Sequence, residues 1–268
     1  MIEFLQELKE YFDIRRLMDY GDPISKSICL LRHDIDHDLN KALQLGKIEY
    51  SLGIQATYFV LHDAKYYGNN DFIKKCLDLQ NMGHEIGFHN NIVTTSIKTG
   101  HNIKELFEKE LDYLRKNNIN IFGTAAHGDT VCRNLNYTNY EIFKECTPPY
   151  TNRKNQLKIE KNVNKVIKKI KRAGSPDVTL NFIQNIKFHT LSLKDYGLYE
   201  AYFLHRDFYT TECSKTWRYI EGKGDEWDTN FRPHSPKLTE LLPFLYKISK
   251  NNIILQALFH PNSSLIEV

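Results

Sequence analysis

Six of the seven positions from residue 32 to residue 38 are ionisable, and they directly follow an apolar run. The stretch "LLRHDIDHD" contains, after two leucines, Arg32, His33, Asp34, Asp36, His37 and Asp38. Asp34 and Asp36 are two residues apart, so on a strand their side chains lie on the same face. One carboxylate can hold a metal ion while the other accepts a proton from water. A turn with a helix cap is the alternative for these acids, although Asp38 already supplies a cap.

Histidines occupy comparable places later in the chain. His89 follows "HEIGF", His127 follows "INIFGTAA" and His260 follows "IILQALF", each an apolar stretch typical of a strand. Histidine and aspartate bind Zn²⁺ and related ions, and a catalytic site takes three protein ligands plus water. We therefore predict a divalent metal, with Zn²⁺ as the first choice among several ions. A turn residue is the alternative for His127. His84 is interpreted as structural.

The elements that position these residues alternate between strands and helices. Strands are predicted within 28–36, 54–61, 84–90, 119–129 and 253–264, and helices within 39–52, 71–83, 102–118 and 237–252. Asp38 and Asp71 are predicted to cap the first two helices. This alternation indicates parallel βαβ units, and no G-x-G-x-x-G follows the first strand. We predict an α/β fold, a parallel β/α barrel whose rim of C-terminal strand ends carries the site.

Length and composition fit one large soluble domain as well as two small ones, and we predict one. The chain has 268 residues, of which 41% are hydrophobic, so one β/α domain over residues 1–268 can bury a sizeable core. A net charge of +3 argues against a general nucleic-acid binder. Five scattered cysteines, no signal peptide and no apolar run near the roughly 20 residues of a membrane span predict a cytoplasmic protein. Residues 151–172 hold nine Lys or Arg and one Glu. They are interpreted as an insertion with a solvated basic helix or a surface for anionic ligands.

Three stretches resemble the polysaccharide deacetylase superfamily, the NodB-homology carbohydrate esterases. "LLRHDID" resembles the first motif in branches with one residue between the acids, "MGHEIGFHN" is similar to the second, and "LQALFHP" resembles the last. The resemblance covers about 28–130 and about 237–263. It implies a distorted β/α barrel of the deacetylase type, a divalent metal and hydrolysis of an N-acyl group on a sugar. It also implies that Asp34 is the general base, that Asp36 and His89 are metal ligands, and that His260 protonates the leaving amine.

Two departures from the family pattern affect the predicted site. The second motif usually has another histidine four residues after the first, and this chain has Val93 there. His127 lies where the third motif usually places an Arg-x-Pro segment, and we predict from its spacing that it completes the metal shell. In "TECSKTW", Glu212 and Trp217 are candidates for substrate binding, although a tryptophan more often belongs to a core.

The resemblance thus implies a metal-dependent hydrolase that removes an acetyl or formyl group from an amino sugar. The expected partner is an intermediate of surface polysaccharide biosynthesis, which could carry a nucleotide or lipid phosphate; no nucleic acid and no transmembrane segment are expected. One alternative is a catalytically degenerate barrel that binds glycans or partners, because Val93 replaces a ligand. Another is a metal-dependent phosphoesterase, for which few carboxylates are available.

Overall fold

The computed structural model describes residues 2–22, 26–135, 137–146, 187–213, 216–221, 232–235 and 238–262. Within these ranges the strands form one ten-stranded sheet. Its spatial order is β6 (Tyr199–Glu200), β5 (Ile121–Ala126), β4 (Glu85–Asn90), β3 (Thr57–Leu61), β2 (Ile28–Ile35), β10 (Ile254–Phe259), β7 (Phe208–Cys213), β8 (Thr216–Glu221) and β9 (Arg232–Ser235). The remaining strand, β1 (Asp13–Arg15), pairs with the first part of β2.

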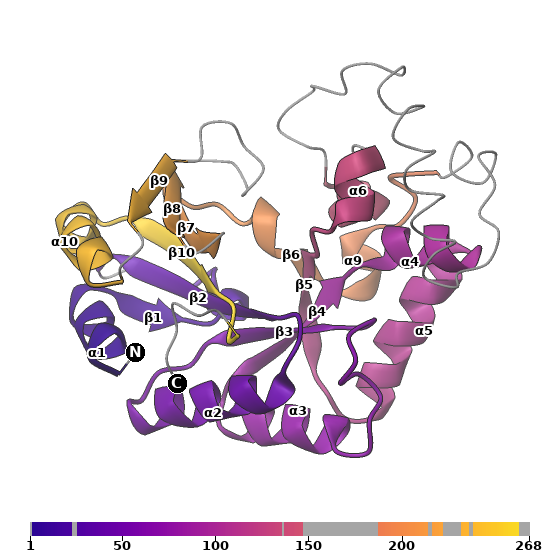
Figure 1. Cartoon of the computed structure of the whole chain (residues 1–268), viewed down its shortest axis with the longest axis horizontal. Coiled ribbons are helices and arrows are strands. Elements are labelled where there is room, and N and C mark those ends of the chain that lie inside the picture. Colours follow the sequence, from indigo (N-terminus) through magenta and orange to yellow (C-terminus); the bar gives the residue numbers. More distant parts are fainter. Residues whose placement is uncertain are drawn as a thin grey trace.

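The neighbouring strands from β6 to β7 are all parallel. They curl into a half-barrel, so their C-terminal ends lie along one rim (Figure 1). The pairs β7–β8 and β8–β9 are antiparallel and extend the sheet. The predicted parallel α/β fold and its barrel-like curvature are therefore confirmed, whereas the described strands leave β6 and β9 as two open edges.

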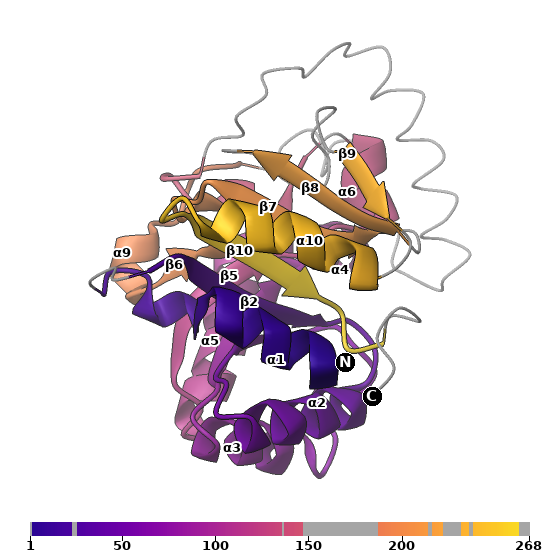
Figure 2. The ribbon, with the colours of Figure 1, turned by 90° about the vertical axis from the view of Figure 1, so that its left-hand side faces the viewer.

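Helices surround the curled sheet. They are α1 (Ile2–Tyr11), α2 (Leu39–Ser51), α3 (Phe72–Asn81), α4 (Ile92–Thr99), α5 (Ile103–Lys116), α6 (Thr130–Leu135), α9 (Leu193–Tyr196) and α10 (Leu238–Ser249). Short 3-10 turns are η1 (Leu17–Asp19), η2 (Asn139–Ile142) and η3 (Ala201–Phe203). Figure 1 shows α2, α3 and α5 along the convex side, and Figure 2 shows α1 beside α10, with which it is in contact. None of the described helices is long and apolar enough to cross a bilayer.

Helix α2 begins where the charged cluster ends. The Asp38 side chain accepts hydrogen bonds from the backbone N–H groups of Asn40 and Lys41, which confirms the predicted cap. Apolar residues at helical spacing, Leu39, Ala42 and Leu45 among them, are buried against the sheet. The cap and the apolar face together fix the direction in which the chain leaves the rim after β2.

All eight residues of β2 are buried, because the strand is covered on both faces. Leu31 belongs to the main core under the helices, whereas Leu30 packs with Phe59 inside the curl. The same alternation directs Arg32 and Asp34 to the inside of the curl. The chain therefore passes from the apolar core to the charged cluster without leaving the strand.

Some elements differ from the expectations. The sequence does not predict α4, β1 or the antiparallel extension. Antiparallel strands need no crossover helix, so helix–strand alternation gave no signal for β8 and β9. Asp71 makes no cap bond to α3 and pairs instead with Lys75. The basic segment predicted at 151–172 lies outside the described residues.

Candidate metal centre

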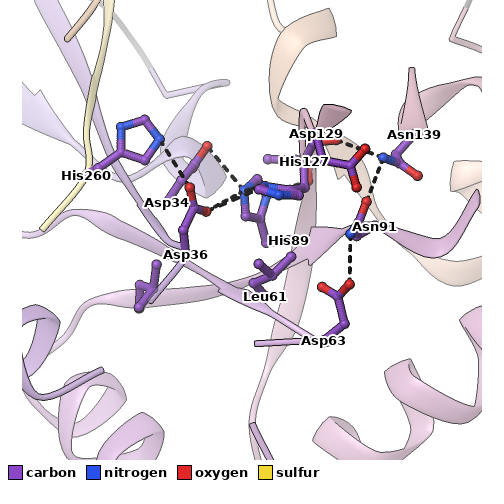
Figure 3. A network of polar contacts seen from close by, with 12 residues as sticks. Asp34, Asp36, Leu61, Asp63, His89, Asn91, His127, Asp129, Asn139 and His260 are labelled. Carbon is purple, nitrogen blue, oxygen red and sulfur yellow. Dashed lines mark hydrogen bonds and ion pairs between the residues drawn. The ribbon is translucent and has the colours of Figure 1, made fainter. Parts of the chain in front are cut away.

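Four strand ends bring the predicted site residues together at the rim. Asp34 lies in the last part of β2 with Asp36 just after it, His89 lies in β4, and His127 and His260 directly follow β5 and β10. Pairing of β2 with β10 and of β4 with β5 keeps these ends level. Figure 3 shows Asp36 between His260 on one side and His89 with His127 on the other.

Asp36, His89 and His127 form a group that could hold a metal ion, since their ligand atoms all lie within 4.8 Å of one another. Asp36 Oδ1 is 3.3 Å from His89 Nε2 and 3.6 Å from His127 Nδ1. The two histidine nitrogens are 3.2 Å apart. Zinc bonds of about 2.0–2.1 Å in a tetrahedron place neighbouring ligand atoms roughly 3.3 Å apart. The triad therefore already has the spacing of three ligands around one ion.

Buried polar atoms at the triad support this fit. Asp36 Oδ1 is buried and has the His89 and His127 nitrogens as its ion-pair contacts, but no hydrogen bond of good geometry satisfies it among the described residues. An ion bound between the three atoms would satisfy it. His89 Nδ1–H donates to the Ala125 carbonyl at 2.8 Å. That bond fixes the tautomer and turns the lone pair of His89 Nε2 towards Asp36, which is the usual support of a metal-binding histidine. Aspartate and histidines thus present the donor set that zinc prefers.

Electrostatic coupling within the triad favours a cation. Burial would raise the pKa of Asp36, but His89, His127 and His260 lower that pKa below its ordinary value. Burial opposes the charge on His89, yet Asp34 and Asp36 raise its pKa. Burial and the neighbouring His89 lower the pKa of His127. The two carboxylates therefore favour a positive charge beside His89, and a metal ion at the centre would supply that charge.

Arg32 holds the second carboxylate of the site. Its Nη2 donates to Asp34 Oδ2 at 3.2 Å, and the two side chains are 0% and 3% exposed. The guanidinium also lies over the Tyr202 ring, 4.4 Å from its centroid. Asp34 Oδ1 makes no hydrogen bond within the described part of the chain. The sequence predicts no role for Arg32, although its place two residues before Asp34 puts both on one face.

The other histidines of the motifs face away from the triad. His33 lies on the outer side of β2, where its Nε2 is 2.7 Å from Glu49 Oε1. His84 contacts the Gly46 carbonyl through Nε2, at 2.9 Å, as its structural interpretation predicts. His37 is exposed. Burial of His33 and His84 therefore serves the packing of α2 on the sheet.

Two positions in the second motif are explained by packing. Val93 lies in α4 and is completely buried in the main core, so the residue that replaces the family's second histidine contributes to packing. Gly87 precedes His89 by two residues, and a methyl group there would overlap the Phe59 ring. A glycine at this point lets β3 and β4 approach closely beneath the site.

For the two residues predicted to bind substrate, the structure describes the backbone only. Glu212 in β7 and Trp217 in β8 are register partners in the antiparallel extension. Their side chains lie outside the described residues. Their contact with a sugar therefore stays a prediction.

Comparison with known proteins gives no relative. No family model matches this chain, and no curated protein or solved structure matches it either. The resemblance of its three motifs to carbohydrate esterases therefore remains an expectation. At the rim, an aspartate and two histidines can hold a metal ion next to a second aspartate and a third histidine.

Proposed function

We propose that this protein is a metal-dependent hydrolase that removes an N-acyl group, acetyl or formyl, from an amino sugar. The observation that carries the proposal is the Asp36–His89–His127 triad, with Asp34 and His260 at its borders. This is the composition of a catalytic metal site: three protein ligands, which leave the fourth position of a tetrahedral ion to water, plus an acid and a base.

A divalent ion bound at the triad would lower the pKa of water towards ~7 and polarise the amide carbonyl. Asp34 is the base of the proposed reaction. Its Oδ2 is held by Arg32 and lies 3.7 Å from His89 Nε2, beside the triad. Its Oδ1 is left to accept the proton of the attacking water. Asp36 is committed to the metal, so the two acids have separate roles.

His260 is the acid of the proposed reaction. Its Nε2 lies 3.9 Å from Asp36 Oδ2, across Asp36 from the other two histidines. An amine leaves poorly as an anion, so a proton must reach its nitrogen as the C–N bond breaks. A base and an acid on different strands can face the two ends of one scissile amide.

The alternative of a degenerate, glycan-binding barrel rests on Val93. Three features of the structure favour the enzyme: His127 lies where it could be the third ligand, Asp34 is held by a buried arginine, and His260 Nε2 is 3.9 Å from Asp36 Oδ2. A phosphoesterase with two metals would need more carboxylates than the triad region offers among the described residues.

The test is release of a primary amine from N-acetyl and N-formyl amino sugars, free and nucleotide-linked, by the zinc-loaded protein. We expect Asp34→Asn to lower the rate on the order of 10²-fold or more while metal stays bound. Asp38→Asn is the matched control, because asparagine caps a helix as well as aspartate does. Full activity in Asp34→Asn would refute the assigned base. Bound zinc without amine release from any of these sugars would favour the binding protein.

A further inference from the structure

Asn139, in η2, connects the loop of His127 to the beginning of α4. Its side chain is completely buried. The Nδ2 group donates to the His127 carbonyl at 2.7 Å and to Asn91 Oδ1 at 3.0 Å. Its Oδ1 accepts from the backbone N–H groups of Val93 and Thr94 at 3.0 and 3.3 Å. Both donors and both lone pairs of this amide are therefore used.

The partners determine the orientation of the amide. Two backbone N–H groups can only donate and the His127 carbonyl can only accept, so the oxygen and nitrogen of Asn139 cannot exchange places. Aspartate would provide the oxygen acceptors and no donor. Serine would provide a single donor, which cannot bond to both the His127 carbonyl and Asn91 Oδ1. Asparagine is the residue that caps α4 and holds His127 at the same time.

Further bonds anchor the ends of this network in the sheet. The His127 N–H donates to the Asn90 carbonyl at 2.8 Å, so both backbone polar groups of His127 are bound. Asn91 Nδ2 donates to Asp63 Oδ2 at 2.8 Å, just beyond the end of β3. Figure 3 shows the line from Asp63 through Asn91 and Asn139 to His127. The network thus connects the His127 loop to the ends of β3 and β4.

We propose that Asn139 is a positioning residue that makes His127 a metal ligand. His127 lies just beyond the last residue of β5, where its N–H still bonds to β4 but its carbonyl is bound by Asn139 instead of by a strand. A displacement of the loop that begins at His127 would carry its Nδ1 away from Asp36. Asn139 opposes that displacement by linking the His127 carbonyl to the first turn of α4. This inference rests on the metal centre proposed above.

The test is zinc affinity, measured by competition with a chromophoric chelator. Asn139→Asp keeps the acceptors that cap α4 and loses the donors to His127 and Asn91. Loss of an outer hydrogen-bond partner of a metal ligand typically lowers metal affinity about 10- to 100-fold, and we expect a decrease in this range. Asn139→Ser, which can still cap the helix, is the second variant in case a buried carboxylate prevents folding. Asn102→Asp, at the exposed cap of α5, adds the same charge as a control and should leave affinity unchanged.

A double-variant cycle separates positioning from general damage. If Asn139 acts through His127, then Asn139→Asp (or Ser) should change affinity less than about 2-fold in a His127→Ala background. Equal losses in both backgrounds would show a general structural role and overturn the inference. Unchanged affinity in folded Asn139 variants would overturn it too, while leaving the proposed function intact. Absence of zinc binding by the unaltered protein would instead overturn the metal centre and this inference together.

Discussion

The buried pair of Arg32 and Asp34 predicts strongly non-additive effects on stability. The two side chains are 0% and 3% exposed, so water cannot replace a lost partner. Arg32→Met leaves the Asp34 carboxylate buried without its cation, and removal of one partner from such a pair costs about 3–5 kcal/mol. Arg32 Nε and Nη1 make no hydrogen bonds with described residues, so the pair itself includes unsatisfied donors. Arg32→Met combined with Asp34→Asn should therefore be at least about 2 kcal/mol more stable than the sum of the single changes predicts.

Urea-induced unfolding of the metal-free protein and the three variants measures this coupling free energy. The exposed pair of Lys116 and Asp112 is the control, with side chains 76% and 63% exposed. Its coupling should be below about 1 kcal/mol, because solvent screens the charges. Additive changes at Arg32 and Asp34, within about 0.5 kcal/mol, would refute the view that the base is held by a buried ion pair.

Two further changes test the surroundings of the site. Burial lowers the pKa of His62 to about 4. As the pH falls from about 6.5 to 4, His62 therefore binds a proton in the unfolded chain but not in the folded chain. Lowering the pH from 7 to 5 should therefore decrease the free energy of unfolding by about 2 kcal/mol, and His62→Gln should not show this decrease. Equal pH dependence of the two proteins in urea unfolding would contradict this prediction. Gly87→Ala should lower stability by about 1–3 kcal/mol through overlap with the Phe59 ring, as thermal unfolding can measure. Gly21→Ala, which meets nothing within 4 Å, should be nearly neutral, and equal effects of both changes would contradict the packing argument.

Much of the fold could be predicted because its signals are local. The apolar run before Arg32, the cap at Asp38 and the helical spacing in α2 each depend on a few neighbouring residues. The antiparallel β7–β9 extension has no such signal, since its pairing joins segments that the sequence alone does not relate.

The same distinction between local and non-local signals applies to the residues of the candidate site. Strand ends carrying Asp36, His89 and His127 could be recognised from their order, and parallel pairing then brings them together. Asn139 could not, because "TNYE" signals only a helix start, and its contact with His127 depends on how η2 folds back over the rim. The proximity of Arg32 to Asp34 could have been predicted from strand alternation alone, because residues two apart in a strand lie on the same face.

The position of a bound ion tests the central claim most directly. We expect a crystal structure of the zinc-loaded protein, with anomalous diffraction at the zinc edge, to show one ion between Asp36 Oδ1, His89 Nε2 and His127 Nδ1. The bonds should be about 2.0–2.2 Å, with an open position facing Asp34. An ion bound elsewhere, or one bound at this rim with His127 turned away from it, would contradict the account.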